Sequence, residues 1–104
     1  MLETVGRVSG RPVRTAVGFV EEPDGSLLVV AGEPDADWAR NLAAVPVGRV
    51  TVGEGSWDVV ADALDEHEHA RAIRELILRY GTPAERLGAG PSFRLRPAGE
   101  AARQ

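Results

Sequence analysis

The chain has 104 residues, 43% of them hydrophobic and 27% charged, which predicts one globular domain rather than a disordered chain. Cysteine is absent and all 12 basic residues are arginines, so disulfides, cysteine–zinc sites and Schiff-base lysines are excluded. The net charge of −4 argues against a general nucleic-acid-binding protein, and no apolar run is long enough to span a membrane.

The first part of the chain predicts a polar loop followed by a β-hairpin. Residues Gly6–Pro12 contain two glycines, a serine and two arginines, a composition typical of a tight polar turn. Two runs of strand-like residues, Val13–Glu22 and Leu27–Ala31, flank the Asp24-Gly25 pair. Asp-Gly between apolar runs is a strong hairpin signal, so we expect two antiparallel strands here. The second run is continuously apolar, which is typical of a strand covered on both faces.

The middle of the chain predicts a short helix and a second hairpin. We expect Asp37 to cap a helix over Trp38–Ala44, whose apolar positions recur at helical spacing, and Pro46 to end it. Beyond it, Arg49–Val52 and Ser56–Leu64 flank a Gly-Glu-Gly turn. This arrangement predicts two more antiparallel strands.

The last part predicts a long helix and a final strand. Asp65 is placed to cap a helix over Glu66–Tyr80, and Gly81 is placed to end it. One stripe of this helix is expected to face the core, formed by Ala70, Ile73, Leu76, Ile77 and Tyr80. A flexible segment, 82–90, then leads to a strand over Phe93–Arg96 that ends at Pro97.

These elements predict a mainly β (α+β) fold, in which a small antiparallel barrel carries one short and one long helix. The expected organisation is a single domain over residues 1–97 with a flexible C-terminal tail over 98–104. Since residues 1–10 lack the apolar segment of a secretory leader, we expect a cytoplasmic protein. One long helix is too small to cover every apolar strand residue, so we expect a homodimer. The strand residues in question are Val17, Phe19, Leu28 and Val30.

Most residue types that carry chemistry are not arranged as a catalytic or metal site. His67 and His69 are two positions apart in a predicted helix and face different directions, so no shared metal is expected. Asp58 and Asp62, four positions apart in a predicted strand, lie roughly 13 Å apart, too far for a carboxylate pair. No serine has the context of a nucleophile elbow. Catalytic residues therefore remain unassigned.

The segment Gly6-Arg7-x-Ser9-Gly10-x-x-x-Arg14 is the one with chemical content. Two glycines allow backbone amides to turn toward an anion, Ser9 adds a hydroxyl, and Arg7 and Arg14 can form charge-assisted bonds to a phosphate. An ordinary exposed turn is the alternative interpretation.

Residues 4–15 resemble the opening motif of the deazaflavin-dependent nitroreductase and quinone reductase family. Three further matches follow in the family's order: the apolar strand that runs into Val30-Ala31, the Trp38–Leu42 segment with Pro46, and the strand at 49–53. The resemblance implies a split β-barrel that binds coenzyme F-420, or FMN in related branches. It also implies transfer of a hydride to a small organic molecule such as a quinone, a nitro compound or an enone.

The resemblance assigns roles to individual residues of this chain. It implies that the cofactor is bound by Arg7, Ser9, Gly10, Arg14, Ala31 and Trp38, with the first four on its phosphate and the last two near its ring. It implies a substrate pocket that contains Tyr80, Trp38 and Asn41. The chain has Glu33 where family members often have a lysine. The alternative is therefore a split barrel without a redox cofactor that binds a small ligand or catalyses a cofactor-independent step.

Overall fold

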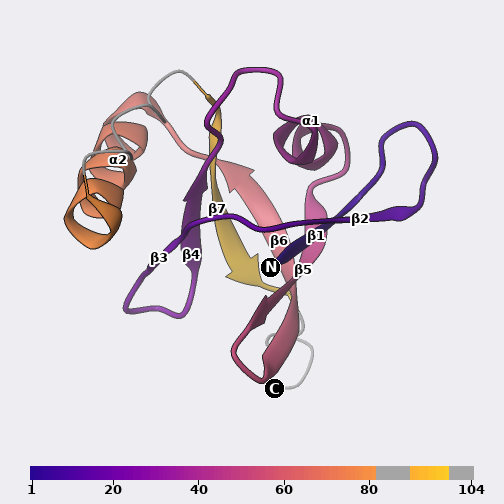
Figure 1. Cartoon of the computed structure of the whole chain (residues 1–104), viewed down its shortest axis with the longest axis horizontal. Helices are drawn as coiled ribbons and strands as arrows, with labels where there is room; N and C mark the ends of the chain where they lie inside the picture. Colours follow the sequence, from indigo (N-terminus) through magenta and orange to yellow (C-terminus); the bar gives the residue numbers. More distant parts are fainter. Residues whose placement is uncertain (82–89, 99–104) are drawn as a thin grey trace.

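The computed structural model describes residues 1–81 and 90–98, which form one seven-stranded antiparallel sheet and two helices (Figure 1). The strand order is β2-β1-β5-β6-β7-β4-β3. The strands are β1 (Leu2–Val5), β2 (Pro12–Thr15), β3 (Val20–Glu21), β4 (Leu27–Val30), β5 (Val47–Val52), β6 (Gly55–Ala63) and β7 (Ser92–Pro97). The helices are α1 (Asp37–Ala44) and α2 (Glu66–Tyr80). This arrangement confirms the mainly β fold with one short and one long helix, and it fits a small split barrel.

The sheet has an inner face, which carries the larger apolar core. Along β6, Val59 and Ala61 are buried on this face while Asp58 and Asp62 alternate with them on the other. Helix α1 covers the inner face, and its buried residues join the core formed by the strands. This inner core consists of Leu2, Leu27, Val29, Ala31, Trp38, Ala39, Leu42, Val50, Val59, Ala61, Phe93 and Leu95.

The opposite, outer face is covered by α2 over β3 and β4 (Figure 1). Leu28 and Val30 of β4 are buried there against Ala72 and Leu76. Val17 and Phe19 pack on the inner core instead. The apolar side chains on which the dimer prediction rested are therefore packed within the chain, and that reason for a dimer is wrong. Over β2, β1 and β5, the outer face has no such cover among the described residues.

One predicted strand is divided in two. The expected strand over Val13–Glu22 contains β2 and β3, which lie at opposite edges of the sheet (Figure 1). Residues 16–19 connect the two edges of the sheet. They are not part of a strand, and positions 16 and 18 are exposed. The prediction of one continuous strand was wrong because strand-like composition does not specify the partner of each residue. The hairpin at 23–26 is confirmed, with the amide of Gly25 donating to the carbonyl of Glu22 at 3.0 Å.

Helix α2 follows the predicted bounds closely. The carboxylate of Asp65 accepts a hydrogen bond from the amide of Glu68 at 2.8 Å, and Gly81 is the C-cap. Its buried stripe differs from the predicted one: Ala70 and Tyr80 are exposed, and Ala72, which was not predicted, is buried with Leu76. For α1 the cap prediction was wrong: Ala36 is the N-cap, without a side-chain bond. Asp37 belongs to the first turn.

A cluster of charged side chains joins α2 to the sheet. The Glu22 carboxylate accepts hydrogen bonds from Arg71 at 2.6 Å and from Arg94 at 3.4 Å. Arg94 also binds both oxygens of Glu68, at 2.8 and 2.9 Å. The hydrogen bond from Arg71, opposed in part by burial, lowers the pKa of Glu22 below its ordinary value of 4.5. The cluster therefore holds α2 over β3, β4 and β7.

The predicted flexible segment and tail fall largely outside the described residues, which exclude 82–89 and 99–104. Two neighbouring residues are described. Gly90 is buried, and the amide of Ala98 donates to the carbonyl of Asp58 at 2.8 Å. The boundary at residue 97 stays a prediction.

Candidate cofactor-binding site

The loop between β1 and β2 is closed by its own backbone. The amide of Gly6 donates to the carbonyl of Arg11 at 2.8 Å, and the amide of Gly10 donates to the carbonyl of Gly6 at 2.8 Å. Gly10 has φ 75°, a left-handed conformation that glycine adopts without strain. The Ser9 hydroxyl accepts a hydrogen bond from the amide of Arg11 at 3.1 Å. The loop is thus a defined turn, and its exposed side carries Ser9, Gly10 and Arg11.

Arg7 anchors this loop to helix α1. Its guanidinium donates to the side-chain oxygen of Asn41 at 2.7 Å and pairs with the Asp37 carboxylate at 3.2 Å. The backbone amide of Arg7 donates to the same Asn41 oxygen at 3.2 Å. The Asn41 amide nitrogen donates in turn to the Thr4 hydroxyl at 3.1 Å. Because Asn41 and Thr4 are both buried, this network fixes the loop to α1 and β1 together.

Arg14 lies on the outer face of the sheet rather than beside Arg7. Its guanidinium pairs with Glu3 at 3.2 Å, and its side chain is 75% exposed. Within residues 1–81 and 90–98, the Arg11 side chain has no ion-pair partner. The structure therefore does not bring Arg7 and Arg14 into one pair, and Arg11 is the unpaired guanidinium of the loop.

Ala31 and Trp38 are brought together in the inner core. Ala31 directly follows β4 and is fully buried. Gly90 packs so closely against it that a Cβ added to Gly90 would clash with the carbonyl oxygen of Ala31. Trp38 is buried in α1, with its ring 6.3 Å from that of Phe93. Asn41 is also buried on α1, where its amide is engaged by Arg7 and Thr4. Helix α1 thus connects the loop to this apolar region.

Tyr80 lies apart from these residues, at the end of α2. Its hydroxyl is 3.4 Å from both the amide and the carbonyl of Phe19. Its ring lies against Gly18, and the Arg79 guanidinium is 5.5 Å from the ring centre. Half of Tyr80 is exposed, so the residue borders the segment that connects the two edges of the sheet.

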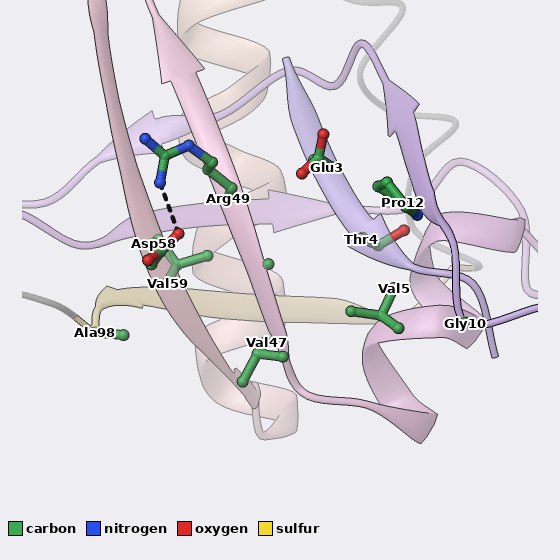
Figure 2. Close-up of a pocket in the computed structure, with 11 residues that line it drawn as sticks. Glu3, Thr4, Val5, Gly10, Pro12, Val47, Arg49, Asp58, Val59 and Ala98 are labelled. Carbon is green, nitrogen blue, oxygen red and sulfur yellow. Dashed lines mark hydrogen bonds and ion pairs between the residues drawn. The ribbon is translucent and has the colours of Figure 1, made fainter.

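A hollow of about 420 Å³ lies on the outer face beside the loop (Figure 2). Glu3 and Val5 of β1 line it together with Val47 and Arg49 of β5 and Asp58 of β6. Arg49 binds the Asp58 carboxylate at 2.8 Å across this surface. Gly10 and Pro12 also contribute, so the hollow extends to the end of the loop.

A second hollow, of about 430 Å³, lies where α2 begins. His69 lines it and makes a 2.7 Å hydrogen bond with the buried hydroxyl of Ser92. His69 is therefore half-buried and bonded, not a solvated surface residue. Within the described part of the chain, no group of three or more histidine, aspartate or glutamate side chains is placed to bind a metal. No described helix is long and apolar enough to cross a membrane.

Comparison with known families identifies the chain. The model of the F420H(2)-dependent quinone reductase family matches residues 1–86. The chain belongs to this family. The match begins before the Gly6–Arg14 segment and extends past α2, so it includes every residue assigned above from the resemblance. A comparison with curated proteins finds no match.

Solved structures share the fold of this family member. An F420-H2 dependent reductase, FDR-A, is 26% identical with a TM-score of 0.77, over 91% of this chain and 90% of that one. HutZ, the heme storage protein from Vibrio cholerae, is 25% identical with a TM-score of 0.73, over 92% and 78%. A protein of unknown function from Agrobacterium tumefaciens is 28% identical with a TM-score of 0.76, over 94% and 47%.

The sequence interpretation missed the partners of the arginines. Asp37 and Asn41 hold Arg7, and Glu3 holds Arg14. Asp37 and Asn41 are four positions apart in a helical pattern, so they share one helix face. That spacing is the one signal in the sequence that they act on the same group.

Proposed function

We propose that this chain is an F-420-dependent reductase that transfers a hydride from reduced F-420 to a small organic acceptor. The observation that carries the proposal is the β1–β2 loop, fixed to α1 by Arg7 and Asn41 in a chain of the F420H(2)-dependent quinone reductase family. Quinones, nitro compounds and enones are the proposed acceptors. All three accept a hydride at an electron-poor carbon or heteroatom.

The exposed side of the loop is the proposed binding site for the phosphate of such a cofactor. Ser9 and Gly10 lie at the turn with Arg11, and Arg14 follows on β2. A phosphate binds well to guanidinium groups and to a hydroxyl held in a fixed turn. Because the amides of Gly10 and Arg11 already donate within the loop, the proposed ligands are the side chains, and Gly10 contributes the turn itself. Arg7 is a proposed phosphate ligand too, but a phosphate there has to compete with Asp37. We assign Arg7 the additional role of holding the loop in place.

The ring of the cofactor is proposed to lie toward Ala31 and Trp38, and the acceptor toward Trp38 and Tyr80. When bound, reduced F-420 supplies the hydride. Trp38 offers an apolar wall and is held in place by the inner core. The Asn41 side chain is buried and engaged, so its proposed contribution to the pocket is to position α1 and the loop. Tyr80 presents a half-exposed ring with a hydroxyl bonded to the backbone of Phe19.

Family membership favours this reductase over a cofactor-free small-ligand binder, and it favours F-420 over FMN. Titration of the purified protein with F-420, followed by fluorescence at low salt, tests cofactor binding. We expect saturable binding with F-420 and much weaker binding with FMN. A cytoplasmic location remains a prediction.

A second experiment tests turnover. Reduced F-420 is mixed with the protein and a quinone, a nitroaromatic compound or a cyclic enone, and the appearance of oxidised F-420 is followed by absorbance. Acceptor-dependent oxidation in at least one case is expected. Arg74→Ala, an exposed substitution on α2, is the matched control for arginine variants of the loop. Absence of F-420 binding in folded protein contradicts the proposal.

A further inference from the structure

The hydroxyl of Ser92 and the imidazole of His69 form a hydrogen-bonded pair at the start of α2. Oγ of Ser92 lies 2.7 Å from Nδ1 of His69, and the two residues belong to different elements, β7 and α2. Both line the second hollow, of about 430 Å³. A serine hydroxyl that donates to a neutral imidazole is the usual arrangement of an activated nucleophile and its base. Neither residue has a part in the proposed cofactor and acceptor sites.

The backbone and the packing fix both members of the pair. Ser92 is the first residue of β7, opposite Val30 of β4, and its carbonyl accepts a hydrogen bond from the amide of Leu64 at 3.1 Å. It is 5% exposed, so packing holds its side chain. His69 belongs to the first turn of α2, where its amide donates to the carbonyl of Asp65 at 2.8 Å. Two groups held in this way are oriented for proton transfer before any substrate binds.

The rest of the hollow determines which molecules fit beside the pair. Its walls are mainly apolar and are formed by Ala43, Ala63, Leu64, Pro91 and Phe93. Asp65 and Glu66 also line it, and no arginine does among the residues that the structure describes. A mostly apolar hollow of this size accepts a small aromatic molecule. The two carboxylates disfavour a molecule of negative charge, so an uncharged one is expected.

A donor for a negatively charged oxygen is available in the same hollow. Glu66 is the first residue of α2, so its amide has no acceptor within the helix. The next amides but one, those of Glu68 and His69, donate to the side chain and the carbonyl of Asp65. Because Glu66 lines the hollow, its amide and the positive end of the helix dipole can stabilise an oxyanion that forms there.

We propose that Ser92 and His69 form a catalytic pair that hydrolyses small, uncharged aryl esters. Oγ of Ser92 attacks the carbonyl carbon of the ester while the hydroxyl proton passes to Nδ1 of His69. The bond from this carbon to the leaving oxygen then breaks, and Nδ1 returns the proton to that oxygen. Water next attacks the acyl carbon and gives a proton to Nδ1. The bond to Oγ breaks, Oγ regains the proton, and a carboxylic acid leaves.

No redox cofactor takes part in these steps, so the inference stands apart from the proposed function. A fluorophosphonate tests it, because this reagent bonds covalently to an activated serine. The purified protein is incubated with the reagent, and the adduct is measured by intact mass and located by peptide mapping. We expect one adduct per chain, on Ser92, and none in Ser92→Ala. In His69→Gln the labelling rate should fall at least about a hundredfold, because the general base is lost.

Hydrolysis of 4-nitrophenyl acetate, followed by the absorbance of 4-nitrophenolate, should show the same losses in both variants. Two substitutions are matched controls. His67→Gln removes an exposed histidine two positions away, and Ser56→Ala removes an exposed serine in β6. Both should react with the fluorophosphonate and the ester at the wild-type rate.

A thiol at position 92 provides a second measurement. Since the chain has no cysteine, Ser92→Cys introduces the single thiol of the protein. Its alkylation by iodoacetamide should become at least about tenfold slower when His69→Gln is added, because the imidazole promotes formation of the thiolate. Circular dichroism establishes that each variant folds, and Ser92→Cys replaces Ser92→Ala if the latter does not.

Three results overturn the proposal. One is a wild-type protein that stays unlabelled under conditions in which chymotrypsin is labelled completely. Another is an adduct on a residue other than Ser92. The third is an equal rate of labelling in wild type and in folded His69→Gln, because the bond between His69 and Ser92 then has a structural role only.

Discussion

The side-chain oxygen of Asn41 accepts two hydrogen bonds from Arg7, one from the guanidinium at 2.7 Å and one from the backbone amide at 3.2 Å. One buried oxygen thus fixes both the direction of the arginine and the path of the loop that carries it. A second bond, from the Asn41 amide to Thr4, determines which way the amide group faces. The conformation of the β1–β2 loop therefore depends on a residue 34 positions away.

Asn41→Leu should destabilise the protein and loosen the loop. The substitution keeps a similar volume but leaves the Arg7 amide and the Thr4 hydroxyl without their partner, a loss of about 1–3 kcal/mol in the free energy of unfolding. Urea denaturation measures this loss. Cofactor affinity should fall as well, because the loop is no longer held for the phosphate.

A matched control separates this effect from a general weakening of α1. Arg40 is the neighbouring residue on the exposed side of the helix, and Arg40→Leu should change the free energy of unfolding by less than about 0.5 kcal/mol. Equal losses in the two variants would show that the Asn41 network contributes nothing specific.

Local features of the fold were predictable from the sequence, because they depend on residues close together in the chain. Asp65 and Gly81 were predicted as the limits of α2, since caps act within one helical turn. The division of Val13–Glu22 was not predictable, because it depends on which edge of the sheet each half joins. That choice is made by long-range pairing, which periodicity does not encode.

In the candidate site, too, local features were predictable from the sequence and long-range contacts were not. The composition of the loop indicated an anion site before any partner was known. The roles of its arginines, however, depend on acids elsewhere in the chain. Arg7 binds Asp37 of α1, while Arg14 binds Glu3 on the other face of the sheet. Spacing within the loop contains no information about either acid.

Arg14→Ala should raise the dissociation constant for F-420 about tenfold or more, because a charge-assisted contact to the phosphate is lost. Arg14→Lys should recover part of this affinity, since an ammonium group cannot form a two-bond fork. Arg11→Ala should have a comparable effect because this guanidinium has no ion-pair partner within the described residues. Fluorescence titration at low salt gives the affinities.

Glu33→Lys should tighten binding of the same cofactor, provided that residue 33 lies near the phosphate, because it replaces a repulsive charge by an attractive one. Glu54→Lys in the β5–β6 turn is the matched control and should leave the affinity unchanged. If F-420 binds saturably and its affinity is the same in Arg14→Ala, Arg14→Lys and wild type, the phosphate lies elsewhere.

Glu22 should contribute stability that is lost in acid. Its pKa is lowered in the folded protein, chiefly by the hydrogen bond from Arg71, so the unfolded chain binds a proton more readily. The contribution is therefore complete above the unfolded value near 4.5 and disappears as the pH falls through the folded pKa. Glu22→Gln should lower the free energy of unfolding by about 1–3 kcal/mol at pH 7.

Urea denaturation of Glu22→Gln and wild type at about pH 7 and about pH 3 measures how the difference shrinks in acid. Glu21→Gln changes the adjacent, exposed carboxylate and is the control variant for the same measurements. A difference of the same size at both pH values would mean that packing, not the charge of Glu22, is responsible.

Leu76 should contribute more to stability than any neighbouring apolar residue of α2. Its side chain is 1% exposed and packs with Leu28 and Val30 in the smaller apolar core between α2 and the outer face of the sheet. Leu76→Ala should therefore lower the free energy of unfolding by about 2–5 kcal/mol. Ile77 only borders this core, so Ile77→Ala should cost less. Leu78 is 79% exposed, and Leu78→Ala removes the same atoms at a cost below about 0.5 kcal/mol. Urea denaturation of the three variants gives the ranking. Equal losses at positions 76 and 78 would mean that α2 does not cover the outer face as described.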